Sequence, residues 1–283
     1  MLQSDPVGFV LYLFYLLVFT SPAGLGSVVL AKYLAAACVM LVTVLLSLIL
    51  HEVAHGYVAY RCGDATAKWM GRLSLDPRKH LDPIGTICMF LFGIGWAKPV
   101  PVNPRNFHNY RRDDFLVSIA GIVTNLSLFV LCTALAVGVN AVMFKPEFLQ
   151  EFKSYFGTLE YVISPYYVYG NSIASGNVTE ELLAAMAHPW LQYVQRFLLN
   201  MATINLSLAV FNFLPIPPLD GYHIFNDLLF RGRFQLSGQA FRVAQVVLLL
   251  LCFSGLLSEL LYFINTHVFS AVTHLFLMMT GGA

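Results

Sequence analysis

The sequence predicts an all-α polytopic membrane protein with about five or six transmembrane helices and a short β-rich or re-entrant segment after the second of them. Of the 283 residues, 58% are hydrophobic and only 11% are charged, whereas a soluble globular domain carries about 25% charged residues. The apolar residues also fall into runs that approach or exceed the about 20 residues a helix needs to cross a bilayer. Lipid is therefore the expected solvent for most of the chain.

Hydropathy places the spanning helices in order along the chain. They are expected near residues 7–24, 32–60, 115–144, 188–214 and 239–264. The first lacks a basic leading region, so we predict a retained helix and not a removable signal. The apolar run at 84–97 has only about 14 residues, which suits a re-entrant or interfacial hairpin better than a span. The tail 266–283 either extends the last helix or lies on the surface.

The distribution of charge predicts which loops face the cytoplasm. The segment 61–114 is rich in Lys and Arg, and the loop 215–238 adds Arg231 and Arg233. The loop 145–187 carries more Glu than Lys. Because basic loops stay in the cytoplasm, we expect 61–114 and 215–238 inside and 145–187 outside. The two basic segments come out on the same side, as a consistent topology requires.

Composition also excludes some classes of protein. The net charge is +1, so no basic surface indicates nucleic-acid binding. The five cysteines are scattered and form no CxxC pair. This pattern argues against a disulfide framework and against a thiolate zinc site.

The second predicted span ends in the polar sequence HEVAH, residues 51–55. Residues four apart lie on one face of a helix, so the imidazoles of His51 and His55 can bind one ion. Glu52 lies beside them and can activate a water on that ion without binding the metal itself. HExxH is the pattern of zinc hydrolases, and ionisable residues in spanning segments usually mark function. The alternative is that these polar residues only end the helix at the interface.

A third metal ligand is expected elsewhere, because a catalytic zinc site has three protein ligands and one open position. The best candidate lies in NFLPIPPLDG, residues 212–221. Its prolines bar a continuous helix, and Gly221 permits a tight turn. Asp220 could instead cap the following helix. Since Asp220 and the HExxH pair both fall at cytoplasmic helix ends, we predict that Asp220 joins His51 and His55 around one zinc ion per chain.

These segments resemble the site-2 proteases, which are intramembrane zinc metalloproteases, and most of all their compact bacterial and archaeal members without PDZ or CBS modules. The resemblance covers residues 43–225 and includes five blocks in order: HEVAHG (51–56), GRLSLDPRKHLDPIGT (71–86), GWAKPVPVNPRNF (95–107), GIVTN (121–125) and NFLPIPPLDG (212–221). Ile122 stands where this family usually has proline, while Asn125 is kept.

The resemblance implies an intramembrane zinc metalloendopeptidase that takes part in regulated intramembrane proteolysis. The zinc ligands of the family carry over to His51, His55 and Asp220, and its catalytic glutamate carries over to Glu52. Asn125 would donate a hydrogen bond to the oxyanion or to the substrate backbone. From its chemistry alone, Asn125 could instead pack helix against helix.

The remaining expectations follow from the resemblance and the topology. We expect one membrane-embedded domain over 1–283, with a catalytic core at about 32–225, a cytoplasmic or re-entrant segment at 61–114 and an extracytoplasmic loop at 145–187. The protein would lie in the cell (inner) membrane, with its active site near the cytoplasmic side. Its substrates would be transmembrane proteins, and a regulatory membrane partner or the loop 145–187 would sense them. The oligomeric state stays open.

Two rival functions remain to be distinguished. A catalytically silent relative would bind membrane segments without cutting them, although Glu52 is intact. A metal transporter would be expected to show internal repeats and acidic groups at the midplane of several spans, and the sequence shows few such acids. Measuring zinc stoichiometry and the effect of a chelator distinguishes these functions. One tightly bound ion and cleavage blocked by the chelator favour a protease, whereas flux of the ion across vesicles favours a transporter.

Overall fold

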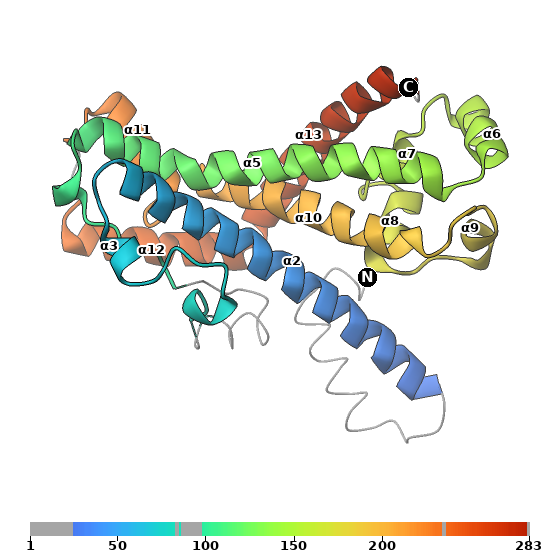
Figure 1. The fold of residues 1–283 in the computed structure, drawn as a ribbon, viewed down its shortest axis with the longest axis horizontal. Coiled ribbons are helices and arrows are strands. Elements are labelled where there is room, and N and C mark those ends of the chain that lie inside the picture. Colours follow the sequence, from blue (N-terminus) through green and yellow to red (C-terminus); the bar gives the residue numbers. More distant parts are fainter. Residues whose placement is uncertain (1–24, 83–84, 86–97, 234–235, 282–283) are drawn as a thin grey trace.

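The computed structural model describes residues 25–82, 85, 98–233 and 236–281, with side chains described from Cys38 onward (Figure 1). Within this part of the chain, four helices are long and apolar enough to cross a membrane. They are α2 (Leu25–Arg61), α5 (Tyr110–Met143), α10 (Leu191–Asn212) and α13 (Leu256–Thr280). A shorter apolar helix, α12 (Gly238–Phe253), precedes the last of these. The predicted span at 7–24 lies outside the described residues.

Three of the long helices, α2, α5 and α10, form the centre of the fold (Figure 1). Helix α5 starts at an Asn109 cap, whose side chain accepts a hydrogen bond from Arg112 N. Its buried face repeats every three or four residues, which is the pattern of a helix packed on both neighbours: Val117, Gly121, Asn125, Phe129, Cys132, Ala136 and Asn140. The predicted spans at 32–60, 115–144 and 188–214 therefore correspond to α2, α5 and α10.

At one end of the bundle, the predicted loop 145–187 folds into a small helical cap. It contains α6 (Pro146–Phe156), α7 (Glu160–Ile163), α8 (Val168–Ser175) and α9 (Glu180–Ala184). Phe144, Phe152 and Ile173 are buried there in the larger hydrophobic core. Lys153 Nζ donates to Gly281 O, so the C-terminal end of α13 lies at this end of the molecule.

The predicted span at 239–264 is wrong in its limits. Helix α12 ends at Phe253, and α13 begins at Leu256 and takes in the apolar tail. Gly255 has φ 79°, a left-handed conformation that glycine adopts without a Cβ penalty. Hydropathy is uniformly high across this break, so an average over a window could not place it.

The β-rich expectation for the segment after α2 is not met where the structure describes it. Residues 71–82 and 98–107 contain turns and the short helices η1 (Pro77–Lys79) and η2 (Pro104–Asn106), but no named strand. Prolines cannot donate to a strand ladder, and they recur at Pro99, Pro101 and Pro104. The apolar residues 83–84 and 86–97, where we expected a hairpin, lie outside the described residues. A short helix, α3 (Thr66–Trp69), follows α2.

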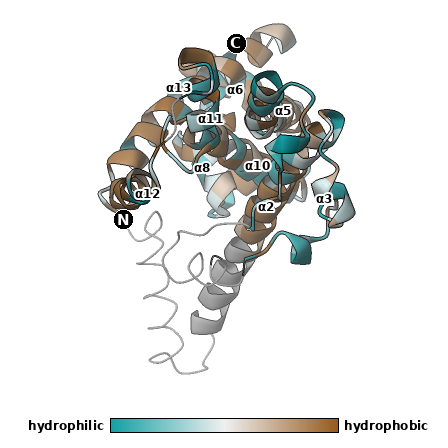
Figure 2. Cartoon of the chain, turned by 90° about the vertical axis from the view of Figure 1, so that its left-hand side faces the viewer, coloured by the Kyte–Doolittle hydropathy of each residue, from teal (hydrophilic) through white to brown (hydrophobic). Residues whose placement is uncertain are grey.

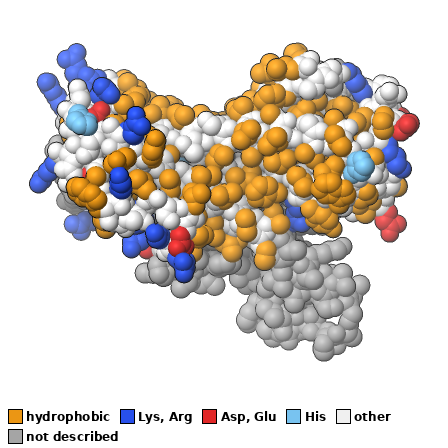
Figure 3. Space-filling view, viewed as in Figure 1, with side chains coloured by type: hydrophobic (Ala, Val, Ile, Leu, Met, Phe, Trp, Pro, Cys, Tyr) orange, Lys and Arg blue, Asp and Glu red, His pale blue; other side chains and the backbone are white. Residues whose placement is uncertain are grey.

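The surface shows how the bundle meets its surroundings. An apolar belt covers its middle, and the long helices are predominantly hydrophobic (Figures 2 and 3). Lys and Arg side chains gather most densely at the end that holds α3 and α11 (Asp220–Leu229), while acidic and basic side chains lie together at the opposite end near the helical cap (Figure 3). The protein is therefore an integral membrane protein.

Candidate metal centre

Helix α2 carries a buried polar stripe that ends at the HExxH residues. Thr43, Ser47, His51 and His55 recur every fourth residue, and all four are buried. Ser47 Oγ accepts a hydrogen bond from Asn205 Nδ2 of α10 at 2.8 Å, which places Asn205 in helix contact and not at the metal-ligand cluster. His51 and His55 thus lie inside the bundle and do not simply end the helix in solvent.

Asp220 reaches the same place from the other end of the sequence. The proline-containing segment after α10 turns the chain, and α11 then begins at Asp220. A Cβ on Gly221 would collide with the carbonyls of Phe213 and Leu214, so glycine is required for α11 to pack against the end of α10. The Asp220 carboxylate faces the imidazoles of α2, which favours its predicted role as a ligand over a capping role.

The three side chains form a compact cluster. His51 Nε2 lies 3.2 Å from Asp220 Oδ2 and His55 Nε2 lies 3.3 Å from it. The two Nε2 atoms are 3.0 Å apart. Ligand atoms bound to one tetrahedral zinc at about 2.0–2.1 Å are about 3.3 Å from each other. The observed separations therefore suit three ligands of one small ion, and this is the one such cluster found among the described residues.

The charge on Asp220 also suits a ligand. Burial alone would raise the pKa of its carboxyl group, but the hydrogen bonds and charges of His51 and His55 outweigh burial. The pKa of Asp220 therefore lies well below its usual range, and the group is an anion at neutral pH. A carboxylate and two imidazoles form a donor set that zinc commonly takes.

Helix α5 contacts both imidazoles at their Nδ1 atoms, on the side away from Asp220. His55 Nδ1 lies 2.7 Å from the carbonyl oxygen of Val117, and Asn125 Nδ2 lies 3.1 Å from His51 Nδ1. A Cβ on Gly121 would lie 2.6 Å from His51 Nδ1. Gly121 thus leaves the space that the His51 ring occupies.

Glu52 lies next to the cluster, and its carboxylate is held by the segment 98–103. Glu52 Oε2 accepts a hydrogen bond from Val100 N at 2.8 Å. Val100 lies between Pro99 and Pro101, so its N–H is the only backbone donor in that tripeptide. Arg72 Nη2 donates to Lys98 O and Pro99 O and fixes the segment. The pattern of side chains in the sequence does not assign Val100, and the prolines on either side of it are the signal that could have found it.

His223 does not join the ligand cluster. It lies on α11 and its Nδ1 is 3.4 Å from Asp114 Oδ2. The Asp114 hydrogen bond raises the pKa of His223, although burial opposes this. One turn further along α11, Asp227 is buried, and neither of its carboxylate oxygens has a hydrogen-bond partner among the described residues.

Asp227 gives a testable dependence of stability on pH. Burial, and then the Asp114 charge, raises the pKa of Asp227 to about 6, from about 3.9 in an unfolded chain. The folded state therefore binds more protons between these values, and stability falls as pH rises through them. Above pH 6 the cost is on the order of 2–3 kcal/mol. Asp227→Asn should raise the unfolding temperature in detergent at pH 7.5 and change it little at pH 4. A loss of stability at both pH values would contradict this assignment.

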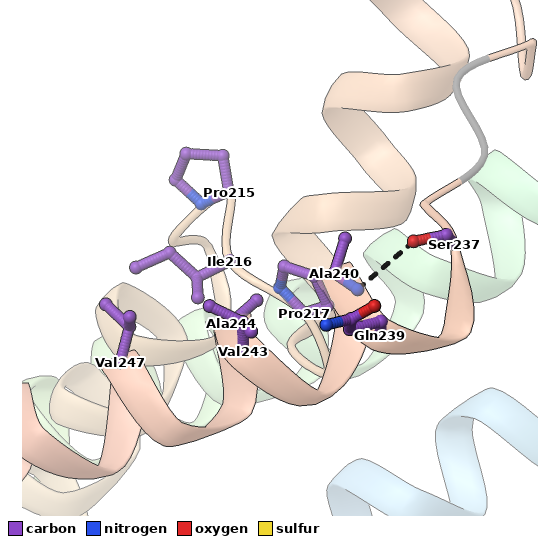
Figure 4. A pocket seen from close by; sticks show the side chains of 9 residues that line it. All are labelled: Pro215, Ile216, Pro217, Ser237, Gln239, Ala240, Val243, Ala244 and Val247. Carbon is purple, nitrogen blue, oxygen red and sulfur yellow. Dashed lines mark hydrogen bonds between the residues drawn. The ribbon is translucent and has the colours of Figure 1, made fainter.

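An apolar groove lies beside the segment that leads to Asp220. Its volume is about 630 Å³, and it is bounded by Pro215, Ile216 and Pro217 on one side and by α12 on the other (Figure 4). Ser237 Oγ caps α12 by accepting a hydrogen bond from Ala240 N (Figure 4). None of His51, His55 and Asp220 lines this groove, so the metal cluster is a separate feature.

A HExxH helix embedded in an apolar bundle, with an aspartate from a distant segment at its histidines, defines a membrane-embedded zinc metalloprotease. Comparison with known proteins identifies which kind. The chain belongs to peptidase family M50, the site-2 protease family, which matches residues 39–255. The family resemblance seen in the sequence is thereby confirmed, and the protein is an intramembrane zinc metalloprotease.

Two relatives illustrate the similarity. The chain is 38% identical over 223 residues to YwhC of Bacillus subtilis (strain 168), a candidate zinc metalloprotease, and this covers 79% of the chain and 84% of YwhC. It is 30% identical over 184 residues to Rip2 of Mycobacterium tuberculosis, also a candidate zinc metalloprotease, which covers 63% of the chain and 52% of Rip2. No solved structure matches the chain.

Proposed function

We propose that the protein hydrolyses peptide bonds of membrane-spanning or membrane-tethered proteins at one zinc ion held by His51, His55 and Asp220, with Glu52 as general base. One observation carries this proposal. Three ligand atoms from α2 and α11 lie 3.0–3.3 Å from one another, close to the spacing that tetrahedral zinc imposes on its ligands.

The chemistry divides between the metal and the protein. When bound, zinc polarises a carbonyl group and lowers the pKa of a coordinated water to about 7. Glu52 accepts a proton from the attacking water and later returns it to the leaving nitrogen. The hydrogen bond from Val100 N orients the Glu52 carboxylate for both transfers. Because Glu52 follows His51 in the sequence, it lies near the proposed metal site. It is not one of the three proposed ligands, which are His51, His55 and Asp220.

The site would work near the cytoplasmic face of the cell membrane. Its residues lie at the end of the bundle where α2 ends at Arg61 and α5 begins with Arg111 and Arg112 in its first turn. Basic segments stay in the cytoplasm. Water, which is a substrate of hydrolysis, would therefore reach Glu52 from the cytoplasm without crossing the apolar belt.

The substrate must present an extended stretch of chain. Every backbone group of a transmembrane helix is hydrogen-bonded within the helix, so its peptide bonds are poorly accessible to Glu52. Substrates with helix-breaking Gly, Pro or Asn near the cytoplasmic end of a span would unwind more readily and be cleaved faster. A regulatory membrane protein or the helical cap over 145–187 would control which substrates reach the site.

Metal removal tests the proposed function. The purified protein in liposomes should cleave a single-span test protein, lose this activity when a chelator strips the zinc, and regain it at one zinc ion per chain. Cleavage is measured by the appearance of the two fragments. Cleavage that survives complete zinc removal would overturn the proposal. Zinc flux into the liposomes without cleavage would favour the rival transporter function.

A further inference from the structure

We infer that Asn125 is a positioning residue that accepts a hydrogen bond from His51 Nδ1–H and thereby fixes the tautomer of His51 that can bind zinc. This inference rests on the proposed zinc binding by His51 and His55. It assigns Asn125 a role different from the one implied by the family resemblance, in which its amide would donate to the oxyanion or to the substrate.

Each neutral imidazole of the cluster carries its proton on one of its two ring nitrogens. A neutral imidazole has one N–H and one nitrogen with a free lone pair. The Nε2 atoms of His51 and His55 face Asp220 and each other, so these are the nitrogens that would bind the metal. The proton of each ring must then sit on Nδ1, and each Nδ1–H needs an acceptor because both rings are buried.

His55 shows what such an acceptor looks like. Its Nδ1 lies 2.7 Å from Val117 O, and a carbonyl oxygen can only accept. This contact fixes the proton of His55 on Nδ1 and leaves Nε2 free for the metal. Metal-binding histidines generally donate their second N–H to a carbonyl or carboxylate in this way.

Asn125 lies at Nδ1 of His51, as Val117 O lies at Nδ1 of His55. Its amide lies 3.1 Å from His51 Nδ1 through Nδ2, while its Oδ1 is buried and has no hydrogen-bond partner among the described residues. Two donors would face each other if His51 carried its proton on Nδ1. The two ends of a carboxamide have nearly the same shape, so a half-turn of the amide fits the same space. Oδ1 then accepts from His51 Nδ1–H, so Oδ1 and Nδ1–H gain a partner while Nδ2 turns away from His51.

Helix α5 brings these contacts together at intervals of one turn. Val117, Gly121 and Asn125 lie four residues apart and share one face of the helix. Val117 O contacts His55, Gly121 leaves room for the His51 ring and Asn125 contacts its Nδ1. Asn125 is fully buried against α2 in this arrangement. An amide committed to His51 has one remaining end, which points away from Nδ1.

Zinc affinity and cleavage together separate the two roles of Asn125. Asn125→Ala removes the acceptor and should weaken zinc binding 10–100-fold, the usual cost of losing a partner of a metal-binding histidine. Asn125→Asp keeps an acceptor oxygen in place and should restore affinity to within a few-fold of the original protein. Affinity is measured by competition with a chromophoric zinc chelator, which requires no catalysis. Asn140→Ala is the matched control, since Asn140 is also buried on α5 but lies about 22 Å further along the helix.

A donor role predicts a different pattern. Asn125→Ala would then bind zinc as tightly as the original protein and lose cleavage only, and Asn125→Asp, which lacks an N–H, would lose cleavage as well. That result would overturn the inference while leaving the zinc site intact. If the original protein itself bound no zinc, the proposed function would fail instead. Gly121→Ala tests the underlying assignment of His51 as a zinc ligand: the added methyl group displaces the His51 ring, so it should weaken zinc binding whichever role Asn125 has, although alanine favours the helix.

Discussion

Glu52→Gln is expected to reduce cleavage of a membrane-embedded test protein by about 10²–10⁴-fold while leaving zinc bound. That range is the usual contribution of a positioned general acid or base. The glutamine side chain has nearly the shape of glutamate and can still accept from Val100 N through its carbonyl oxygen. It cannot take a proton at neutral pH, and it does not touch the cluster of His51, His55 and Asp220. Cleavage is measured in liposomes, and zinc is measured by metal analysis of the same preparation.

The control for this experiment is the same substitution at a remote glutamate. Glu259 is exposed in the first turn of α13, so Glu259→Gln should cleave at the original rate. Unchanged turnover in Glu52→Gln would remove Glu52 from the role of base. Loss of zinc together with cleavage would instead indicate that Glu52 supports the metal site, and the test of its catalytic role would then rest on the pH dependence of the residual rate.

The parts of the site that the sequence predicted share one property: their signal lies in ligand side chains and in where these fall relative to a helix end. His51 and His55 are four residues apart after an apolar run, and Asp220 follows a proline-rich turn at a helix end on the same side of the membrane. The spacing of residues on a helix determines the direction in which their side chains point. The charge of the loops predicts on which side of the membrane each helix end lies. Together these two constraints brought residues from α2 and α11 into one cluster, although 165 positions separate His55 from Asp220.

The contacts that the sequence could not predict involve backbone atoms or breaks in a helix. Val117 contributes a carbonyl oxygen to His55, and Val100 contributes an N–H to Glu52. Every residue type except proline has both groups, so no side chain marks the Val117 contact, and only the flanking prolines mark the Val100 contact. The break at Gly255 is marked in the sequence only by the Ser254-Gly255 pair, and a hydropathy average hides it because α12 and α13 are both apolar.

Asp220→Ala is expected to weaken zinc binding by more than about 100-fold and to abolish cleavage. Losing an outer partner of a ligand already costs 10–100-fold in affinity, and losing a charged ligand costs more. The remaining imidazoles of His51 and His55 would hold zinc with two ligands, one fewer than a catalytic site requires. The zinc-dependent rise in unfolding temperature should shrink with the affinity, because a ligand at free concentration L stabilises the folded state by RT ln(1 + L/Kd), which falls as Kd rises.

Asp76→Ala provides a matched control for charge and residue type. Asp76 caps η1 and pairs with Arg78, and it does not belong to the metal cluster. This variant should keep both its zinc and the zinc-dependent rise in unfolding temperature. Comparing Asp220→Ala with Glu52→Gln then separates zinc binding from catalysis. Glu52→Gln should keep zinc and lose cleavage, whereas Asp220→Ala should lose both. Tight zinc binding in Asp220→Ala would mean that another residue completes the coordination, and the role of α11 in holding the metal would have to be abandoned.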